Sequence, residues 1–476
     1  MNRGLFNKTK IVATIGPATQ EEDVLRRIIE AGVDVCRLNF SHGTHDAHLI
    51  VIDRIRKINK ELGTHVSILM DLQGPKLRIG KVDGEIQLID GQIITVTTEE
   101  CISTAERLFV SYARLALDAK PGERILLNDG KVELKVLEIL DEKQLRAAVV
   151  VGGVLTSNKG FNLPETQLTV PCLTEKDLKD LEFGLQQNVD WIALSFVRRP
   201  EDILELKQII GMHEKDTRVI AKIEKPEAVE NIKEIVKVSD AIMVARGDLG
   251  VELPLQRVPL IQKDIVEKCI QAAKPVIIAT QMMESMIYDS MPTRAEINDV
   301  ANAVLDGADA VMLSAETGVG KYPVRVVEVM SSIITDVEKD KRVYFKGKKP
   351  NNTSPSFASD EVCFTAVRMS DHLEAKAIVA MTRSGYTGFR VASYRPMASV
   401  FIFTDNYSLL TRLSLVWGVR GFYYDEYVST DQTFQDVTDV LKDEGIVKHG
   451  DCIINCASMP IHKKQRTNTI KVTFVD

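Results

Sequence analysis

The 476-residue sequence contains no run of the ~20 apolar residues that a membrane-spanning helix needs. Its first ten residues, MNRGLFNKTK, lack the apolar core of a secretory signal peptide. The seven cysteines are an odd number without a C-x-x-C pair, which argues against a disulfide framework. These absences predict a protein of the reducing cytoplasm.

An excess of positive charge is missing too. The formal net charge is −7, which argues against nucleic acid or an anionic membrane as the main partner. The fragment TGVGKYP (317–323) lacks the spacing of a Walker A phosphate loop, and protein-kinase signatures are absent. Any phosphate group must therefore be bound by positive side chains that the fold brings together locally.

The sequence does contain eight short apolar segments that alternate with amphipathic, helix-period segments such as EEDVLRRIIEAG. Eight strand–helix units predict a TIM (β/α)8 barrel. The predicted strands span residues 10–16, 33–40, 66–74, 190–196, 218–224, 240–247, 275–281 and 308–314.

Two further domains are expected. Between the third and fourth strands the pattern changes to short alternating segments with turn residues, such as GEIQLIDGQIITVT, which predicts an inserted all-β lid domain. After the charged and polar linker 340–359, five more apolar segments predict a C-terminal α/β domain. The expected division is barrel at 1–74 and 171–345, lid at 75–170, and α/β domain at 355–476.

Polar residues collect where the predicted barrel strands end, which is the active-site end of such barrels. Residues two apart in a strand share a face, so Lys222 and Glu224 are predicted to lie side by side, and likewise Arg246 and Asp248. One charged pair is often structural, but polar residues on five strands together predict a functional site. The set is Arg37, Asn39, Ser41, Asp71, Lys222, Glu224, Arg246, Gly247, Asp248 and Thr280.

The residue types in this set indicate phosphoryl chemistry. Two carboxylates, Glu224 and Asp248, are too few for an all-protein calcium cage and suit Mg²⁺, which keeps water and substrate oxygens as further ligands. Lys222 and Arg37 add positive charge beside that metal, as a transferring phosphoryl group requires. The turn at Gly247 offers backbone N–H groups to an anion.

Several segments resemble the pyruvate kinase family, in order and spacing: TKIVATIGPAT, CRLNFSHG, DLQGPKLRIG, AKIEKPEAVENI, ARGDLGVE, IATQMMESM and the run from PTRAEIN to TGVGKYP. The resemblance implies transfer of a phosphoryl group from phosphoenolpyruvate to ADP, giving pyruvate and ATP in the last step of glycolysis. It also implies Mg²⁺ or Mn²⁺ as cofactor, a homotetramer, and an allosteric effector.

The resemblance assigns roles residue by residue. Lys222, Arg37 and Thr280 would be catalytic: Lys222 beside the moving phosphoryl group, Arg37 on the phosphate, and Thr280 near the carbon that is protonated. Glu224 and Asp248 would bind Mg²⁺. The substrate-binding set adds the backbone of Gly247 and Asp248 to these, and the nucleotide-binding set is Asn39, Phe40, Ser41, His42, Arg78 and Lys159, with help from Asp129.

Many members of the family hold potassium at positions that match Asn39, Ser41, Asp71 and Leu72. This chain reads DLQGPKLRIG where those members usually read D-T-K-G-P-E-I-R-T-G, so Leu72 replaces a threonine ligand and Lys76 replaces a glutamate. A lysine ammonium is a fixed monovalent cation. We therefore expect Lys76 to supply the charge of potassium and activity not to require it, as in the potassium-independent branch that this pattern resembles.

A second site is expected in the C-terminal domain. AIVAMTRSGYTGFRVASY predicts a strand, a hydroxyl-rich loop and a helix, which together can bind an anion or form a plain capped turn. The resemblance favours an effector phosphate at Thr382, Arg383, Ser384 and Thr387. The segment 456–469 lacks the glycines of fructose-bisphosphate-regulated relatives, so AMP, ribose 5-phosphate and glucose 6-phosphate remain equally open.

Two other functions also remain open at this point. A magnesium-dependent aldolase or lyase of pyruvate-like acids would share the carboxylates, but it would not explain the lid with Lys159 and the nucleotide-side Arg78. A non-catalytic sensor of phosphometabolites would be free to lose Lys222, Glu224, Asp248 or Thr280, and all four are present.

Overall fold

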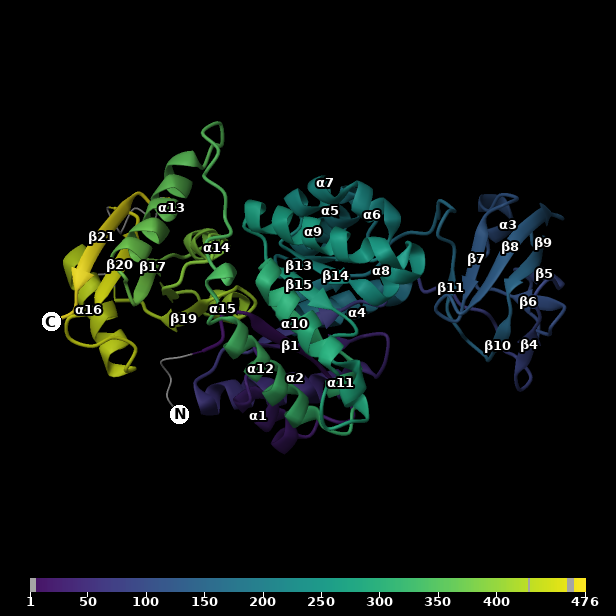
Figure 1. Cartoon of the computed structure of the whole chain (residues 1–476), viewed down its shortest axis with the longest axis horizontal. Helices are drawn as coiled ribbons and strands as arrows, with labels where there is room; N and C mark the ends of the chain where they lie inside the picture. Colours follow the sequence, from purple (N-terminus) through teal and green to yellow (C-terminus); the bar gives the residue numbers. More distant parts are fainter. Residues whose placement is uncertain (1–5, 427–428, 460–465) are drawn as a thin grey trace.

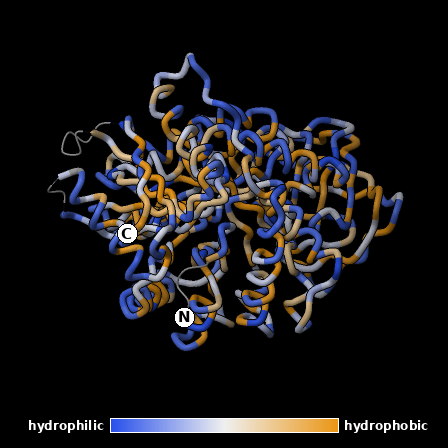
Figure 2. The backbone as a smooth tube through the Cα atoms, turned by 60° about the vertical axis from the view of Figure 1, so that its left-hand side comes forward, coloured by the Kyte–Doolittle hydropathy of each residue, from blue (hydrophilic) through white to orange (hydrophobic). Residues whose placement is uncertain are grey.

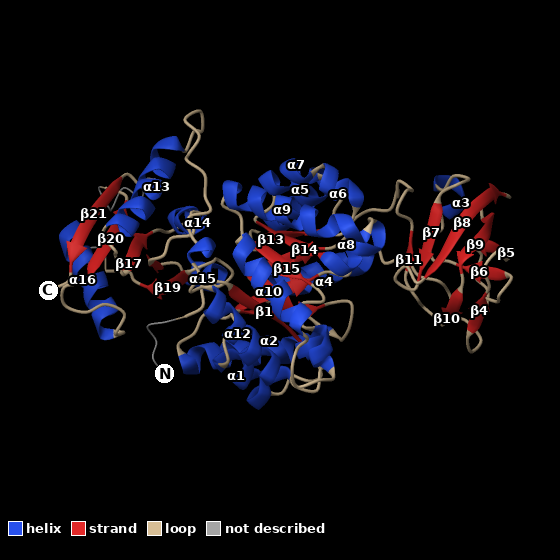
Figure 3. Cartoon of the chain, in the orientation of Figure 1, coloured by secondary structure: helices blue, strands red, loops and turns tan. Residues whose placement is uncertain are grey.

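The computed structural model describes residues 6–426, 429–459 and 466–476. Three bodies follow one another along the long axis (Figure 1): an α/β domain, a central barrel and an all-β domain. Figure 3 shows the central barrel as strands surrounded by helices. The all-β domain consists of strands and loops with the short helix α3. No helix within the described residues is long and apolar enough to cross a membrane.

Eight parallel strands close the central barrel in the order β1-β16-β15-β14-β13-β12-β3-β2, so the predicted TIM barrel is confirmed. The strands are β1 (Lys10–Ile15), β2 (Val35–Asn39), β3 (Ser67–Asp71), β12 (Trp191–Leu194), β13 (Arg218–Ile223), β14 (Ala241–Ala245), β15 (Val276–Ala279) and β16 (Ala310–Leu313). The helices of this body are α1 (Glu22–Glu30), α2 (His45–Leu62), α4 (Glu175–Gln186), α5 (Pro200–Met212), α6 (Pro226–Glu230), α7 (Ile232–Val238), α8 (Arg246–Glu252), α9 (Val258–Ala272), α10 (Arg294–Asp306), α11 (Ala315–Gly318) and α12 (Pro323–Val337). Short 3-10 turns lie at η1 (Leu255–Arg257), η2 (Glu284–Ile287) and η3 (Lys341–Val343).

Alternation along the strands divides the barrel side chains into an outward set, packed against the helices, and an inward set. The inward apolar cluster includes Val12, Val35, Leu69, Ala193 and Ile220. Two positions further along, in the same register, every one of these strands carries a polar residue: Thr14, Arg37, Asp71, Ser195 and Lys222. Because parallel strands all end on one side, these five side chains form one polar layer at the mouth of the barrel.

The all-β domain lies between β3 and α4 and has its own core, which includes Ile94, Leu108, Ile125 and Leu134. One sheet has the order β11-β7-β8-β9-β5-β6, and β10 pairs with β4. The elements are β4 (Ile86–Leu88), β5 (Ile93–Thr97), β6 (Arg107–Phe109), α3 (Leu115–Asp118), β7 (Arg124–Leu127), β8 (Val132–Ile139), β9 (Gln144–Val151), β10 (Gly153–Leu155) and β11 (Phe161–Asn162). A separate core lets this domain act as one body, which we call the lid.

The C-terminal domain is a five-stranded sheet of order β19-β18-β17-β20-β21, in which β21 is antiparallel to β20. All five predicted strands are present. The elements are α13 (Phe357–His372), β17 (Ala377–Met381), α14 (Tyr386–Ser393), β18 (Ser399–Thr404), α15 (Tyr407–Leu413), β19 (Val419–Tyr423), α16 (Thr430–Asp443), β20 (Cys452–Ala457) and β21 (Thr469–Phe474).

Figure 2 shows apolar segments gathered inside the molecule and hydrophilic ones along its outline.

A buried ion pair joins the C-terminal domain to the barrel. Arg395 Nη2 lies 2.8 Å from Asp309 Oδ2, and both side chains are almost fully buried. Asp309 immediately precedes β16, so this contact is at the N-terminal end of the barrel strands. The polar layer lies at the opposite end.

Candidate active site

Lys222 is at the centre of the polar layer. Its Nζ lies 2.7 Å from Ser195 Oγ and 2.8 Å from Glu224 Oε1. A second carboxylate oxygen, Asp71 Oδ1, lies 3.2 Å away. Lys222 and Glu224 are therefore side by side at the end of β13, as their two-residue spacing predicts.

The electrostatics of this cluster keep Lys222 charged. Burial disfavours the ammonium, but Asp71, Glu224 and Asp248 outweigh it and raise the pKa of Lys222. Burial likewise opposes the charge of Asp71, yet Lys222 and Arg37 lower the pKa of that carboxyl. The layer thus holds positive and negative side chains in alternation, joined by ion pairs.

Arg37 is held on two sides. Its Nε donates to Asp71 Oδ2 at 2.8 Å, and its Nη1 donates to Thr14 Oγ1 at 2.8 Å. The Thr14 hydroxyl in turn donates to the carbonyl of Leu313 on the neighbouring strand. The guanidinium therefore has a fixed orientation within the mouth of the barrel.

Glu224 and Asp248 fit a divalent cation. Desolvation, followed by the negative charge of Glu224, raises the pKa of Asp248 to about 6, while Lys222 and Lys76 oppose the shift. Two carboxylates leave coordination positions for water and substrate oxygens, as Mg²⁺ requires.

The prediction that Arg246 and Asp248 share a face of a strand is wrong. Strand β14 ends at Ala245 and α8 begins at Arg246, so these two residues lie on a helical turn. Arg246 pairs with Asp299 of α10 at 2.7 Å. Its guanidinium also donates to the Thr280 carbonyl, which makes it a support for the site.

Thr280 follows β15 in a left-handed conformation, with φ of 68°. Its Oγ1 accepts the backbone N–H of Gly247 at 2.7 Å and donates to the Ala279 carbonyl. A side chain at Gly247 would place Cβ only 3.3 Å from this hydroxyl, so the close approach favours glycine. The structure thus brings Thr280 and the start of α8 together.

Leu72 and Lys76, the two residues of the potassium prediction, differ in burial. Leu72 is buried in the main core of the barrel and offers only its backbone, whose carbonyl accepts from Ser195 Oγ at 2.8 Å. Lys76 is exposed. Desolvation and Lys222 lower the pKa of Lys76, whereas Asp248 and Asp71 raise it, so its charge acts on the same site.

The predicted nucleotide residues fall into two groups. Asn39, Phe40, Ser41 and His42 form one turn after β2, in which Asn39 Oδ1 accepts the Ser41 N–H at 3.1 Å. The lid group lies on paired segments, where Ile79 N–H donates to the Lys159 carbonyl at 3.0 Å. The Arg78 guanidinium donates to the Asn158 carbonyl at 2.9 Å, and within the described residues neither Arg78 nor Lys159 forms an ion pair with a carboxylate.

The predicted effector loop does join β17 to α14. Gly385 has φ of 84°, and its N–H donates to Thr382 Oγ1 at 3.1 Å. Ser384 Oγ accepts the N–H of Tyr386. These hydroxyls cap the turn, so the plain structural reading and an anion site both fit the geometry.

The other two residues of that loop differ in accessibility. The Arg383 side chain is 64% exposed and lies 3.9 Å from Asp405, so it can still meet a ligand. Thr387 is buried and its hydroxyl bonds to that of Thr467. The segment 456–469, used above to weigh fructose bisphosphate, includes residues 460–465, which lie outside the described part of the chain.

Sequence reasoning missed Thr14 and Ser195. Both are hydroxyl residues at the ends of apolar strands, a common place for a residue that satisfies the backbone. The available signal was the register: each lies two positions beyond an inward-facing apolar residue, as Lys222 does.

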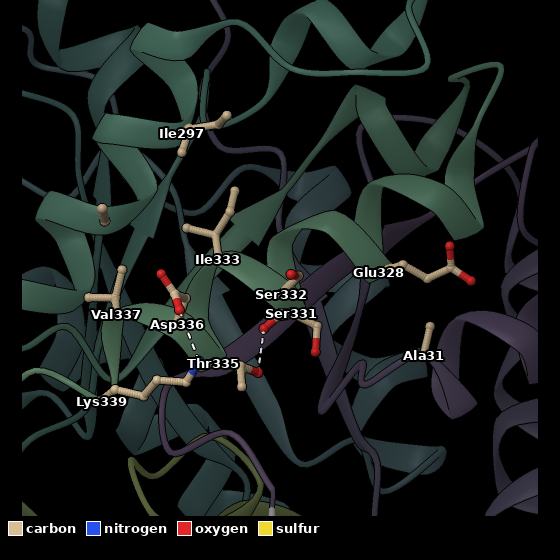
Figure 4. Close-up of a pocket in the computed structure, with 11 residues that line it drawn as sticks. Ala31, Ile297, Glu328, Ser331, Ser332, Ile333, Thr335, Asp336, Val337 and Lys339 are labelled. Atoms are coloured by element: carbon tan, nitrogen blue, oxygen red, sulfur yellow. Dashed lines mark hydrogen bonds and ion pairs between the residues drawn. The ribbon is translucent and has the colours of Figure 1, made fainter.

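A separate groove of about 820 Å³ lies between α1, α10 and α12, on the outer face of the barrel (Figure 4). Its charged side chains are paired along the helix, as Lys339 is with Asp336 at 2.9 Å. None of the polar-layer residues lines it. The groove is therefore distinct from the site at the barrel mouth.

Comparison with known proteins agrees with this geometry. Residues 6–327 match the family model "Pyruvate kinase, barrel domain", and residues 360–473 match "Pyruvate kinase, alpha/beta domain". The chain is 43% identical over 469 residues to a pyruvate kinase of Mycobacterium tuberculosis, covering 98% of each chain. It is 44% identical over 467 residues to one from Corynebacterium glutamicum, covering 98% of this chain and 97% of that one.

The fold has a close counterpart among solved structures. The crystal structure of a pyruvate kinase from Cryptosporidium parvum superposes with a TM-score of 0.92 at 33% sequence identity. The match covers 99% of this chain and 96% of that chain. Barrel, lid and C-terminal domain are therefore shared.

Proposed function

The chain belongs to the pyruvate kinase family, and we propose that the polar layer at the mouth of its barrel carries that family's reaction. Pyruvate kinases transfer the phosphoryl group of phosphoenolpyruvate to ADP, giving pyruvate and ATP in the last step of glycolysis. The observation that supports the site is the placement of the Lys222 ammonium between Glu224, Asp71 and Ser195. Because the chain belongs to this family, we set aside the aldolase, lyase and sensor alternatives.

In the reaction, the bond between the phosphorus and the enol oxygen breaks while a bond to a β-phosphate oxygen of ADP forms. Arg37 holds the phosphate of phosphoenolpyruvate, and Lys222 stabilises the charge on the phosphoryl group and on the enolate. The backbone of Gly247 and Asp248 binds the substrate carboxylate. The enolate then takes a proton at its methylene carbon from water held by Thr280.

Glu224 and Asp248 are the residues that would hold Mg²⁺ or Mn²⁺. Such an ion supplies charge neutralisation for the phosphoryl group and the enolate oxygen. The repulsion that raises the pKa of Asp248 supports this role, because a bound cation would relieve it.

The lid, residues 75–170, would close over the nucleotide. Asn39, Phe40, Ser41 and His42 border ADP from the barrel, and Arg78 and Lys159 reach its phosphates from the lid, with Asp129 beside them. Closure keeps water from intercepting the phosphoryl group. That neither Arg78 nor Lys159 forms an ion pair in the described part of the chain supports this arrangement.

Lys76 would replace potassium in this enzyme. Its electrostatic coupling to Asp248 and Asp71 supports the idea, since a cation at this place would act on the same carboxylates. We expect the variant Lys76→Glu to need added potassium for turnover. Lys81→Glu, an equal charge change at an exposed lid position, is the control and should remain potassium-independent.

We infer regulation and assembly from the family resemblance. Thr382, Arg383, Ser384 and Thr387 would form the effector site, the enzyme would be a homotetramer, and seven free cysteines suit the cytoplasm. Exposed apolar side chains on and beside α9 and α10, such as Leu260, Tyr288 and Met291, support further subunit contacts there.

The variant Lys222→Met tests the proposed site. Turnover should fall by several orders of magnitude because the charge at the transition state is lost, while Mn²⁺ binding, measured by magnetic resonance, should persist. Near-normal turnover in this variant would remove Lys222 from the mechanism.

A further inference from the structure

The lid is hydrogen-bonded to the barrel through one of its own side chains. Asn162, at the end of β11, donates from Nδ2 to Glu252 Oε1 of α8 at 2.7 Å. Figure 1 shows β11 at the waist between the two bodies, on the side where α8 lies. The same oxygen accepts from Lys225 Nζ.

Glu252 is an unusual acceptor. Its side chain is only 2% exposed, and its second oxygen, Oε2, is buried without a hydrogen-bond partner. A hydrogen bond to a desolvated carboxylate is stronger than one between neutral groups. Removing Asn162 would still leave Lys225 on Glu252, so the fold of α8 does not depend on the lid contact.

This contact links groups that act on the substrates. Asp248 precedes Glu252 by one helical turn, about 6 Å along α8. Lys225 directly follows Glu224. On the lid side, Lys159 lies three residues before Asn162, within about 10 Å even for extended chain.

The edge of the lid that meets α8 is a hydrogen-bonded turn. Asn128, Asp129 and Gly130 form a tight turn with φ of 52°, 58° and 81°. The Asn128 N–H donates to the Gly160 carbonyl at 3.0 Å, which fixes this turn to the segment that leads into β11. A Cβ on Gly130 would lie 3.8 Å from Val251 of α8, a second approach of the lid to the same helix.

We propose that Asn162 is a positioning residue that docks the lid on α8 through Glu252 and so holds Lys159 over the nucleotide phosphates. This inference rests on the proposed role of the lid. Lys225 neutralises Glu252, so the carboxylate that accepts the lid does not add an uncompensated negative charge to those of Glu224 and Asp248.

The test compares Asn162→Ala with Lys159→Ala in the full-length enzyme. For Asn162→Ala, kcat/KM for ADP should fall about tenfold, or about 1.4 kcal/mol, mostly through KM. Mn²⁺ affinity, phosphoenolpyruvate binding without nucleotide, and Tm should be unchanged, because those depend on the barrel. A merely structural role would instead lower Tm.

A charge-conserving exchange gives the matched control. Asn162→Asp alone places two carboxylates together and should impair the enzyme at least as much as Asn162→Ala. The double variant N162D/E252Q swaps amide and carboxylate, keeps a partner for Lys225, and should return kcat/KM to within about threefold of wild type.

Wild-type kinetics in Asn162→Ala together with an impaired Lys159→Ala would overturn the docking contact and leave the lid role intact. Wild-type kinetics in both variants would overturn both. A double variant no better than Asn162→Asp would also contradict the contact.

Discussion

Ser195 shows how much a single hydroxyl can fix. Its Oγ accepts from Lys222 Nζ at 2.7 Å and donates to the Leu72 carbonyl at 2.8 Å. Because its own proton is committed to the carbonyl, only a lone pair faces the ammonium. Ser195 therefore orients the Lys222 ammonium through a neutral acceptor and leaves its positive charge unneutralised.

We predict that Ser195→Ala lowers kcat about tenfold and leaves the Mg²⁺ requirement unchanged, because Lys222 keeps both carboxylates but loses its orienting acceptor. Steady-state kinetics with varied Mg²⁺ measure this. Cys172→Ala is the matched control, since Cys172 contacts the Ser195 carbonyl from the buried side and does not reach Lys222. A shift in Mg²⁺ requirement without loss of kcat would contradict the role.

Glu224 gives a second prediction at this scale. Glu224→Ala should raise the Mg²⁺ concentration needed for half-maximal turnover by at least about tenfold, because one of the two proposed protein ligands is lost. It should also weaken phosphoenolpyruvate binding. Titration with Mg²⁺ measures the first effect, and an unchanged requirement would count against Glu224 as a ligand.

Single residues were predictable where the strand period held and not elsewhere. The period of two placed Lys222 beside Glu224 because β13 includes Lys222 and ends at Ile223, directly before Glu224. It failed for Arg246 and Asp248 because β14 ends at Ala245, before both residues, and α8 begins at once. Roles that come from the resemblance, such as that of Thr280, have no signal in the local pattern at all.

At the scale of elements, the loop between β17 and α14 is the piece most open to a test. Thr382→Glu would put a negative charge where an effector phosphate would sit and should abolish the effector response while sparing the basal rate. Rates with AMP, ribose 5-phosphate, glucose 6-phosphate and fructose 1,6-bisphosphate measure it.

The control for that loop is Ser408→Ala on the neighbouring α15, whose hydroxyl bonds only locally, to Asn406. An intact response in Thr382→Glu would move the effector site elsewhere.

The elements themselves were largely predictable from the sequence. The barrel strands are fully or nearly fully buried apolar runs, which stand out from the amphipathic helices between them. The sequence predicted the C-terminal ends of these strands one to three residues too late. The reason is that polar residues at the mouth continue the apolar–polar alternation after the hydrogen-bonded pairing of the strands has ended. Short helical turns such as α11 gave no periodic signal in the sequence.

For the whole molecule, the order of the three bodies places the C-terminal domain and the polar layer at opposite ends of the barrel. The C-terminal domain contacts the barrel at the start of its strands, through Asp309 and Arg395, whereas the polar layer lies at the other end. Within one chain, an effector signal from the predicted loop would therefore have to cross the barrel to reach the polar layer. Which bodies touch which end was not predictable from strand patterns, because it depends on contacts between residues such as these, 86 positions apart.

Lys8 allows a test of that junction. Its ammonium donates to the Ala398 carbonyl and lies 5.3 Å from the Trp417 ring centre. Burial lowers the pKa of Lys8 from its usual 10.5 to about 8, against the opposing charge of Glu338. Between these values the unfolded chain binds more protons than the folded one, so this group makes folding more favourable as pH rises.

We predict that the unfolding free energy of the wild type, relative to Lys8→Met, rises by about 3 kcal/mol between about pH 7 and about pH 10. Chemical denaturation of both proteins across that range measures it. A difference independent of pH would show that the lysine keeps its ordinary pKa at the junction.

The most direct measurement is pyruvate formation from phosphoenolpyruvate and ADP, with Mg²⁺, in buffer free of potassium and ammonium and then with potassium added. Full turnover in the first condition is the predicted result, with Lys76 as the internal cation. Turnover only with potassium would keep the enzyme and remove that role from Lys76. No pyruvate in either condition, from folded protein supplied with the candidate effectors, would contradict the assignment of this reaction to the polar layer of the barrel.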